Sequence, residues 1–367
     1  MGDLATIVRE HRGALEKRRG FLFPNQSKAL DDIQFCQADP DTAVQSYCSK
    51  CDKTHVMLAS CKNRHCPKCQ FNDGEAWCKK QIARLLPVTY FMVTFTVPRQ
   101  LRLMMQNNQR EAYTALFEAV KASLDIVGAN PKYLGGKYGY LAVLHTWARN
   151  LDYHPHIHCI IPGGAFDAEN NLWRKSTGKY LFHVRSLSKI FKGELFRALQ
   201  KRGLISSLPG GSFQRELVVN CKPVAKGEQA LQYLGRYIFR TAISNKRIIK
   251  YEDKWVTFEY RNSKTKQLES KTMHAVDFLE LYIQHILPDN FMKVRTYGLI
   301  HHSNHKLLDR LALLLRWKRP EPHLQKPKSN PCPKCGHKMI RTLHYINKYG
   351  ESRWKQISKV EEVEKLE

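Results

Sequence analysis

His154-Pro155-His156-Ile157-His158-Cys159-Ile160-Ile161 is the stretch of this chain that says most about its architecture. Because side chains alternate between the two faces of a β-strand, His156 and His158 share a face and can bind one metal ion. His154 joins the same face if the intervening proline leaves the alternation intact. The apolar residues that follow predict a strand over residues 156–161.

Further strands and helices are predicted on both sides of the histidine run. β-Branched and aromatic residues predict strands at 88–97 and 139–147. A helix is expected between them, over residues 100–127. After the histidine strand come an apolar run at 216–221 and a helix at 226–244. This order predicts an α+β fold class with a central antiparallel sheet.

The last of these helices carries two tyrosines four residues apart. At about 100° per residue, Tyr233 and Tyr237 lie on one face together with Gln229, Arg236 and Arg240. A tyrosine pair alone is more typical of ordinary packing. The two arginines favour phosphate binding, because a guanidinium group contacts phosphate oxygens through a fork of donors. We therefore predict that both arginines contact DNA.

A divalent cation on the histidine strand suits phosphodiester chemistry. His156 and His158 supply two ligands, and Mg²⁺ or Mn²⁺ needs oxygen donors or a third polar ligand. His145 on the neighbouring strand and Gln229 on the tyrosine helix are both candidates, and the sequence does not choose between them. With charge drawn from a phosphate oxygen, a tyrosine can attack and form a covalent phosphotyrosine.

The composition indicates nucleic acid as the partner. The 367 residues include 60 Lys+Arg against 33 Asp+Glu, a net charge of +27 that far exceeds what solubility requires. An acidic protein or an anionic lipid is less favoured, because arginines and aromatic residues are interleaved throughout. No apolar run approaches the roughly 18 residues of a membrane span, and the first 20 residues lack a signal peptide. We expect a cytoplasmic, nucleoid-associated protein with no membrane partner.

The cysteines have the spacing of metal ligands in a reducing compartment. Two Cys-x-x-Cys knuckles contribute the simplest predicted zinc site, which consists of Cys48, Cys51, Cys66 and Cys69. Cys61 and His65 lie between the knuckles as alternative or second-site ligands. Free thiols in a small core are the less favoured interpretation, given the regular pairs.

Cations lie among these ligands, and a third cysteine pair lies near the other end of the chain. Lys62 and Arg64 are predicted to contact DNA phosphates. Cys332 and Cys335 form half of a zinc site, which histidines at 301, 302, 337 or 344 would complete.

The motifs divide the chain into four predicted parts. Residues 1–87 are a zinc-binding, DNA-binding domain that begins with a helix at 4–19, and residues 88–250 are the catalytic domain. Residues 251–319 form a basic extension, partly helical. Residues 320–367 contain a proline-rich linker, the last cysteine pair and a charged tail.

The chain resembles the HUH single-strand endonucleases, and among them the two-tyrosine rolling-circle transposases of IS91-like insertion sequences. The resemblance runs over nearly the whole length and rests on four strings that occur in the family's order. They are Ser60-Cys61-Lys62-Asn63-Arg64-His65-Cys66-Pro67-Lys68-Cys69-Gln70, Leu144-His145-Thr146-Trp147, His154 to Gly164, and Tyr233-Leu234-Gly235-Arg236-Tyr237 with Ala242-Ile243-Ser244-Asn245.

This resemblance implies a zinc-binding N-terminal domain followed by a catalytic domain with a ferredoxin-like or RRM-like antiparallel sheet. It implies cleavage of single-stranded DNA at an element's end, giving a 5′-phosphotyrosine and a free 3′-hydroxyl. By the resemblance, His156 and His158 are metal ligands, and Tyr233 and Tyr237 are the nucleophiles. The expected partners are single-stranded DNA at transposon ends and targets. The resemblance is also compatible with a homo-oligomer and with host replication or helicase proteins as partners.

Three alternatives use the same motifs. A plasmid replication initiator or a relaxase would perform similar chemistry at a different origin, although the N-terminal zinc knuckles favour a transposase. A non-catalytic zinc-dependent DNA-binding protein would form no covalent product. A zinc hydrolase would use the histidine strand but leave the tyrosine helix without a role, and no acidic ligand motif follows His158.

Overall fold

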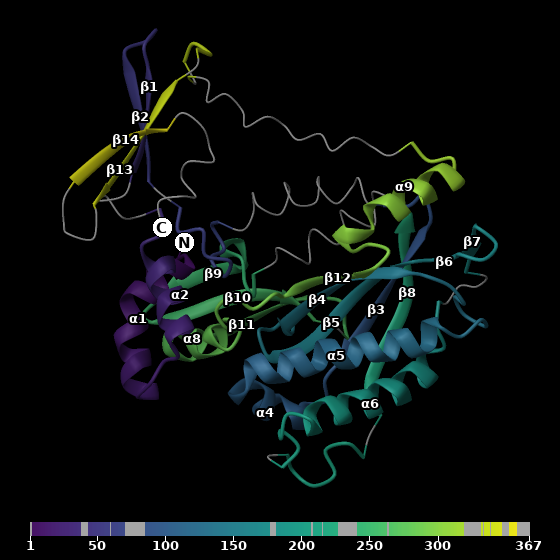
Figure 1. The fold of residues 1–367 in the computed structure, drawn as a ribbon. Helices are drawn as coiled ribbons and strands as arrows, with labels where there is room; N and C mark the ends of the chain where they lie inside the picture. The colour runs from purple at the N-terminus through teal and green to yellow at the C-terminus, as the bar shows by residue number, and fades with distance from the viewer. Residues whose placement is uncertain are drawn as a thin grey trace.

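The computed structural model describes most of the chain (Figure 1). The described residues are 2–37, 43–58, 60–69, 85–176, 181–206, 208–214, 216–226, 241–262, 264–318, 332, 334–337, 339–346 and 352–357.

A five-stranded antiparallel sheet forms the centre of the molecule, in the order β12-β4-β5-β3-β8. Its strands are β3 (Thr89–Thr96), β4 (Gly139–Trp147), β5 (Tyr153–Pro162), β8 (Val218–Lys226) and β12 (Val294–Gly298). The helices between them are α4 (Arg102–Asn107), α5 (Gln109–Gly128) and α6 (Val184–Gln200). Strand, helix, two strands, helix and strand is the ferredoxin-like order, to which β12 adds an edge strand beside β4. The predicted α+β class with an antiparallel sheet is confirmed.

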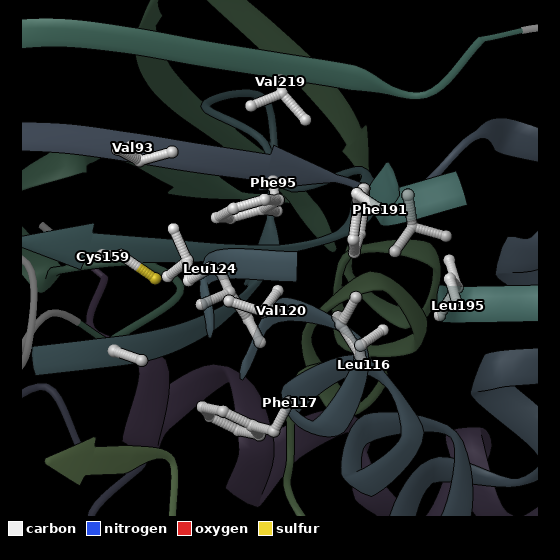
Figure 2. Close-up of a cluster of buried hydrophobic side chains, with 14 of the residues drawn as sticks. Val93, Phe95, Leu116, Phe117, Val120, Leu124, Cys159, Phe191, Leu195 and Val219 are labelled. Carbon is white, nitrogen blue, oxygen red and sulfur yellow. The ribbon is translucent and has the colours of Figure 1, made fainter. Parts of the chain in front are cut away.

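One face of this sheet is buried against α5 and α6 (Figure 1). Figure 2 shows Phe95 and Val219 from the sheet close to Leu116 of α5 and Phe191 of α6. The Phe95 and Phe191 rings meet edge to face with centroids 4.9 Å apart. This core fixes the orientation of the sheet, since a one-residue slip of any strand would move its apolar side chains out of it.

The opposite face is covered at one end by α9 (His305–Leu314) (Figure 1). By strand alternation the histidines lie on this same face, farther along β4 and β5. At the α9 end, Met92 and Ile160 pack with Leu308 and Leu311. The hairpin of β6 (Gly164–Asp167) and β7 (Leu172–Lys175) lies at the same end. One side of the sheet is therefore buried against α5 and α6, and the other side carries both the apolar cluster at α9 and the histidines.

A second core joins segments far apart in the sequence. Helices α1 (Leu4–Arg19) and α2 (Pro24–Gln34) pack with α8 (Ala275–Ile283) and with a three-stranded sheet in the order β11-β10-β9. The strands of this sheet are β9 (Ile248–Glu252), β10 (Trp255–Arg261) and β11 (Leu268–His274). Residues from the predicted zinc-binding part and from the C-terminal extension thus share one core, and the domain boundaries that we set from the sequence stay predictions.

A third sheet has the order β14-β13-β1-β2 and stands apart from the central sheet (Figure 1). It consists of β1 (Ala43–Cys48), β2 (Lys53–Leu58), β13 (Ile340–Ile346) and β14 (Ser352–Ile357). Strand β13 pairs antiparallel with β1, and this pairing brings the C-terminal segment onto the N-terminal hairpin. The sequence analysis anticipated none of these four strands.

Candidate functional site: a histidine cluster and two cysteine clusters

Three histidines from two neighbouring strands converge on the face of the central sheet that packs against α9 at its other end. His145 on β4 lies opposite His156 on β5, and His158 follows two residues later on the same face. Their candidate ligand nitrogens all lie within 4.8 Å of one another. Of the two candidate third ligands, the structure brings His145 to the pair; Gln229 lies outside the described residues.

Hydrogen bonds orient two of the three rings. Nδ1 of His156 donates to the carbonyl oxygen of His154 at 2.7 Å, which leaves Nε2 with its lone pair free for a metal. Nδ1 of His158 lies 2.9 Å from Oγ1 of Thr94 on β3. Thr94 lies opposite His158 in the register of the two strands, so its hydroxyl is a positioning group for that ring.

His154 lies beside the cluster without joining it. Its ring centroid is 5.3 Å from that of His156, so the strand alternation continues through Pro155. However, a guanidinium nitrogen of Arg102 donates to its Nδ1. Arg102 therefore occupies the nitrogen through which His154 could otherwise bind a cation.

Burial keeps the imidazoles of His156 and His158 neutral. It lowers the pKa of His156 to about 4, and it places the pKa of His158 well below the ordinary value, with the neighbouring His156 as a second cause. Neutral imidazole is the form that binds a metal ion. These two rings are therefore ready to bind a cation at neutral pH without first losing protons.

The cluster opens into a cavity of about 610 Å³. The lining residues that the structure describes include no Asp or Glu. Its cations are Arg149, Arg247 and Lys264, and Trp147 and Tyr260 supply aromatic faces. Two nitrogens of Arg247 donate to the carbonyls of Glu259 and Arg149, at 2.7 and 2.6 Å, and so tie the β10 wall of the cavity to the β4–β5 loop.

The five residues that the sequence places on the tyrosine helix lie outside the described residues. They are Gln229, Tyr233, Arg236, Tyr237 and Arg240.

Eight of the described cysteines form two groups of four rather than the single site of Cys48, Cys51, Cys66 and Cys69 that spacing alone suggested. In the first group Cys36, Cys61, Cys66 and Cys69 have their sulfur atoms within 4.8 Å of one another. The grouping differs from the prediction because β1 and β2 carry the first knuckle away from the second.

Sulfur separations in the first group suit a tetrahedral metal site. The Sγ atom of Cys69 lies 3.4 Å from that of Cys36 and 3.5 Å from that of Cys61. A zinc ion with bonds of about 2.3 Å separates its sulfur ligands by about 3.8 Å, whereas a disulfide brings them to about 2 Å. Hydrogen bonds from Cys61, Cys66 and Ser60 lower the pKa of the Cys69 thiol, which favours the thiolate that zinc requires.

The second group contains Cys48 and Cys51 from the N-terminal hairpin together with Cys332 and Cys335. Of the histidines that we had considered as completing ligands for Cys332 and Cys335, those at 301, 302 and 337 are not part of it, and the side chain at 344 lies outside what the structure describes. Although burial opposes the shift, backbone hydrogen bonds from Cys335 and Lys334 lower the pKa of Cys332 to about 6.

Three predicted residues near the first cysteine group differ in their surroundings. His65 is not one of the grouped metal donors: its Nε2 accepts a hydrogen bond from the backbone N–H of Leu287 at 3.2 Å. Arg64 donates to the carbonyls of Phe291 and Pro288, at 2.6 and 2.8 Å. Lys62 is exposed, as a phosphate contact requires.

The sequence analysis assigned no role to Cys36, Thr94 or Arg102. Cys36 was an unassigned cysteine close to the zinc window, just after α2, and that position is the signal that could have identified it. Thr94 and Arg102 offered no comparable signal, because their roles depend on strand register and on the packing of α4 against β5.

Comparisons with known proteins agree with this architecture. A family model described as "Putative transposase" matches residues 139–306, and one described as "Transposase zinc-binding domain" matches residues 7–97. "Putative transposase y4qJ" of Sinorhizobium fredii is 32% identical over 320 residues, which cover 81% of this chain and 80% of that protein.

A second relative is more distant. "Transposase for insertion sequence element IS801" of Pseudomonas savastanoi pv. phaseolicola is 26% identical over 269 residues, which cover 68% of this chain and 63% of that protein. Among the residues that the structure describes, no helix is both long and apolar enough to cross a lipid bilayer. The extent of the first match, together with both family models, shows that the chain belongs to the IS91-like transposase family, whose members are zinc-binding enzymes that act on DNA.

Proposed function

We propose that this transposase nicks and rejoins single-stranded DNA through a 5′-phosphotyrosine, with Tyr233 and Tyr237 as the nucleophiles. The observation that carries the proposal is the convergence of His145, His156 and His158 at a cationic cavity whose described lining has no carboxylate. A cationic lining attracts the phosphates of DNA, and a carboxylate in it would repel them.

Three imidazoles fit a divalent cation, and they fit Mn²⁺ better than Mg²⁺ because Mg²⁺ prefers oxygen ligands. When bound, such a cation draws charge from a non-bridging phosphate oxygen and favours attack at phosphorus. The residues of the chain prepare the site for it. The carbonyl of His154 and the hydroxyl of Thr94 hold two of the rings in place.

The proposed reaction conserves the number of phosphoester bonds. The tyrosine oxygen forms a bond to phosphorus while the bond from phosphorus to the 3′ oxygen breaks. The phenol loses its proton and the departing 3′ oxygen gains one, so that the products are a 5′-phosphotyrosine and a 3′-hydroxyl. A DNA hydroxyl can later attack the phosphotyrosine and restore the tyrosine, which joins strands without ATP. Two tyrosines allow two strands to be held during this exchange.

The described part of the cavity supplies DNA contacts of two kinds. Arg149 and Lys264 are exposed cations at its rim and are suited to backbone phosphates. Trp147, which stacks on His145 with its other face, and Tyr260 line the cavity with aromatic rings on which unpaired bases can stack. Stacking requires unpaired bases, and this preference supports single-stranded rather than duplex DNA as the substrate.

The experiment is a covalent-adduct assay with single-stranded oligonucleotides of the element's ends and Mn²⁺ or Mg²⁺. We expect a denaturant-resistant protein–DNA adduct that is absent from a variant with both Tyr233→Phe and Tyr237→Phe. Tyr133→Phe, a phenol outside the cavity, is the matched control and should keep the adduct. An adduct that persists in the double variant would refute the assignment of the nucleophiles. No adduct in the unchanged protein under either metal would favour a non-catalytic DNA-binding protein.

A further inference from the structure

The second cysteine group lies where an N-terminal hairpin meets a C-terminal segment of the chain. Cys48 ends β1, and Cys51 follows in the turn before β2. Cys332 and Cys335 precede β13, which pairs with β1 in a register that sets Tyr47 opposite Ile340. Strand pairing therefore brings the two knuckles together, and the Sγ atoms of Cys48 and Cys335 are 3.6 Å apart.

The local backbone of the C-terminal knuckle is shaped for metal binding. The N–H of Gly336 donates to the carbonyl of Cys332 at 2.8 Å, and the N–H of Cys332 donates to the carbonyl of His337 at 2.8 Å. These bonds close a tight turn that needs a left-handed residue, and Gly336 has a φ of 72°. The turn points both sulfur atoms to one side, as a Cys-x-x-Cys zinc knuckle does.

The described side chains of the four-stranded sheet gather around the cysteines. Its core cluster consists of Cys48, Cys332 and Met339, with Cys51 and Cys335 packed against them. Tyr47 and Val56 are exposed by 38% and 57%, so in the part of this sheet whose side chains are described no larger apolar residue is buried. A structural zinc ion at this cluster would add directly to the folding free energy of the sheet.

We propose that Cys48, Cys51, Cys332 and Cys335 bind a structural Zn²⁺ that fastens the C-terminal segment to the N-terminal hairpin, separately from the ion of the first cysteine group. The family match for the zinc-binding domain ends at residue 97 and so contains only half of this site. Four buried or half-buried thiols fit Zn²⁺ as a closed, four-coordinate structural ion. The inference does not depend on the nucleolytic function, because its evidence lies in a different sheet.

Zinc stoichiometry of the purified full-length protein tests the proposal. We expect two zinc ions per chain, and one ion in the variant with both Cys332→Ser and Cys335→Ser. The variant with both Cys48→Ser and Cys51→Ser should also retain one ion. The variant with all four changes should still retain one ion, because both pairs belong to the same site. Lys334→Ala, an exposed change within the knuckle, is the control and should keep two.

Two results would overturn the proposal. Zinc content that stays unchanged when Cys332 and Cys335 are replaced would show that they bind none. Loss of both ions in the fourfold variant would show that Cys48 and Cys51 share an ion with Cys66 and Cys69, as spacing alone suggested. Circular dichroism of each variant detects general unfolding, and cobalt substitution then reports on the remaining sites, because a site with four thiolates has a characteristic charge-transfer absorption.

A second measurement tests the fastening itself. A specific protease site inserted within residues 320–331 allows the chain to be cut once. We expect the C-terminal fragment to stay attached after cleavage and to leave when a chelator removes zinc. A fragment that leaves while two ions remain bound, or that stays after zinc has been removed, would contradict the proposed role of the metal.

Discussion

Replacement of Arg64 by alanine distinguishes two roles for this residue. One is the structural role that its hydrogen bonds indicate, and the other is the DNA contact that the sequence predicted. Its guanidinium group donates to the carbonyls of Pro288 and Phe291, which lie between α8 and β12. Burial lowers its pKa, as expected for a cation partly withdrawn from water. The arginine thus links the zinc-binding segment to the loop that leads into the edge strand of the central sheet.

The expected cost follows from these two bonds. A hydrogen bond that involves a charged group contributes about 1.5–3 kcal/mol, so that two of them contribute about 3–6 kcal/mol. Because Arg64 is only partly buried and water can reach the vacated carbonyls, we expect Arg64→Ala to lose about 3 kcal/mol. A loss of this size lowers the melting temperature by roughly 6–12 °C. Lysine presents one compact ammonium group instead of a planar fork, and Arg64→Lys should recover part of the loss.

Thermal unfolding and DNA binding, measured on the same preparations, provide the assay. The matched control is Lys62→Ala, an exposed cation two residues away that should melt like the unchanged protein. If Lys62 contacts a phosphate, its removal should reduce the salt dependence of binding by about one ion. A variant Arg64→Ala with an unchanged melting temperature and the reduced salt dependence would refute the structural role and support the DNA contact.

Three further predictions concern the histidine site and the first cysteine group. Thr94→Val keeps the shape of the side chain but removes the hydroxyl beside His158. The affinity of the site for a metal ion should fall by about 10-fold or more, while DNA binding stays unchanged. A metal titration that gives equal affinities for the variant and the unchanged protein would refute the positioning role. Lys264→Ala should weaken single-stranded DNA binding at low salt. Lys201→Ala, an exposed change at the end of α6, should not. If fluorescence anisotropy shows that both variants lose the same affinity for DNA, only the overall charge matters. Chelation of zinc should unfold the core that contains Cys66 and Cys69, and the near-ultraviolet circular dichroism should change in step with zinc release; an unchanged spectrum would mean that packing alone maintains this core.

Much of the central sheet could be predicted, because its strands are apolar and β-branched. The expected strands at 88–97 and 139–147 correspond to β3 and β4 within one residue at each end. The predicted helix at 4–19 matches α1, which begins after the capping side chain of Asp3 and ends at Gly20 in a left-handed conformation. Local patterns were sufficient for these elements.

What the sequence left undecided depends on contacts between distant segments. Spacing put Cys48 and Cys66 on the same ion, but the pairing of β1 with β13 brings Cys48 to Cys332 instead. The choice of His145 over His154 as the third imidazole likewise required the strand register and the position of Arg102. No local pattern contains this information, because each partner is tens to hundreds of residues away.

Mn²⁺ bound to the purified protein, observed by pulsed electron paramagnetic resonance, tests the central claim most directly. The account predicts nitrogen couplings from three imidazoles, which a variant with both His156→Ala and His158→Ala should lose while it still binds DNA. Mn²⁺ without imidazole nitrogen in its ligand shell, in a protein that nonetheless forms the DNA adduct, would contradict the account.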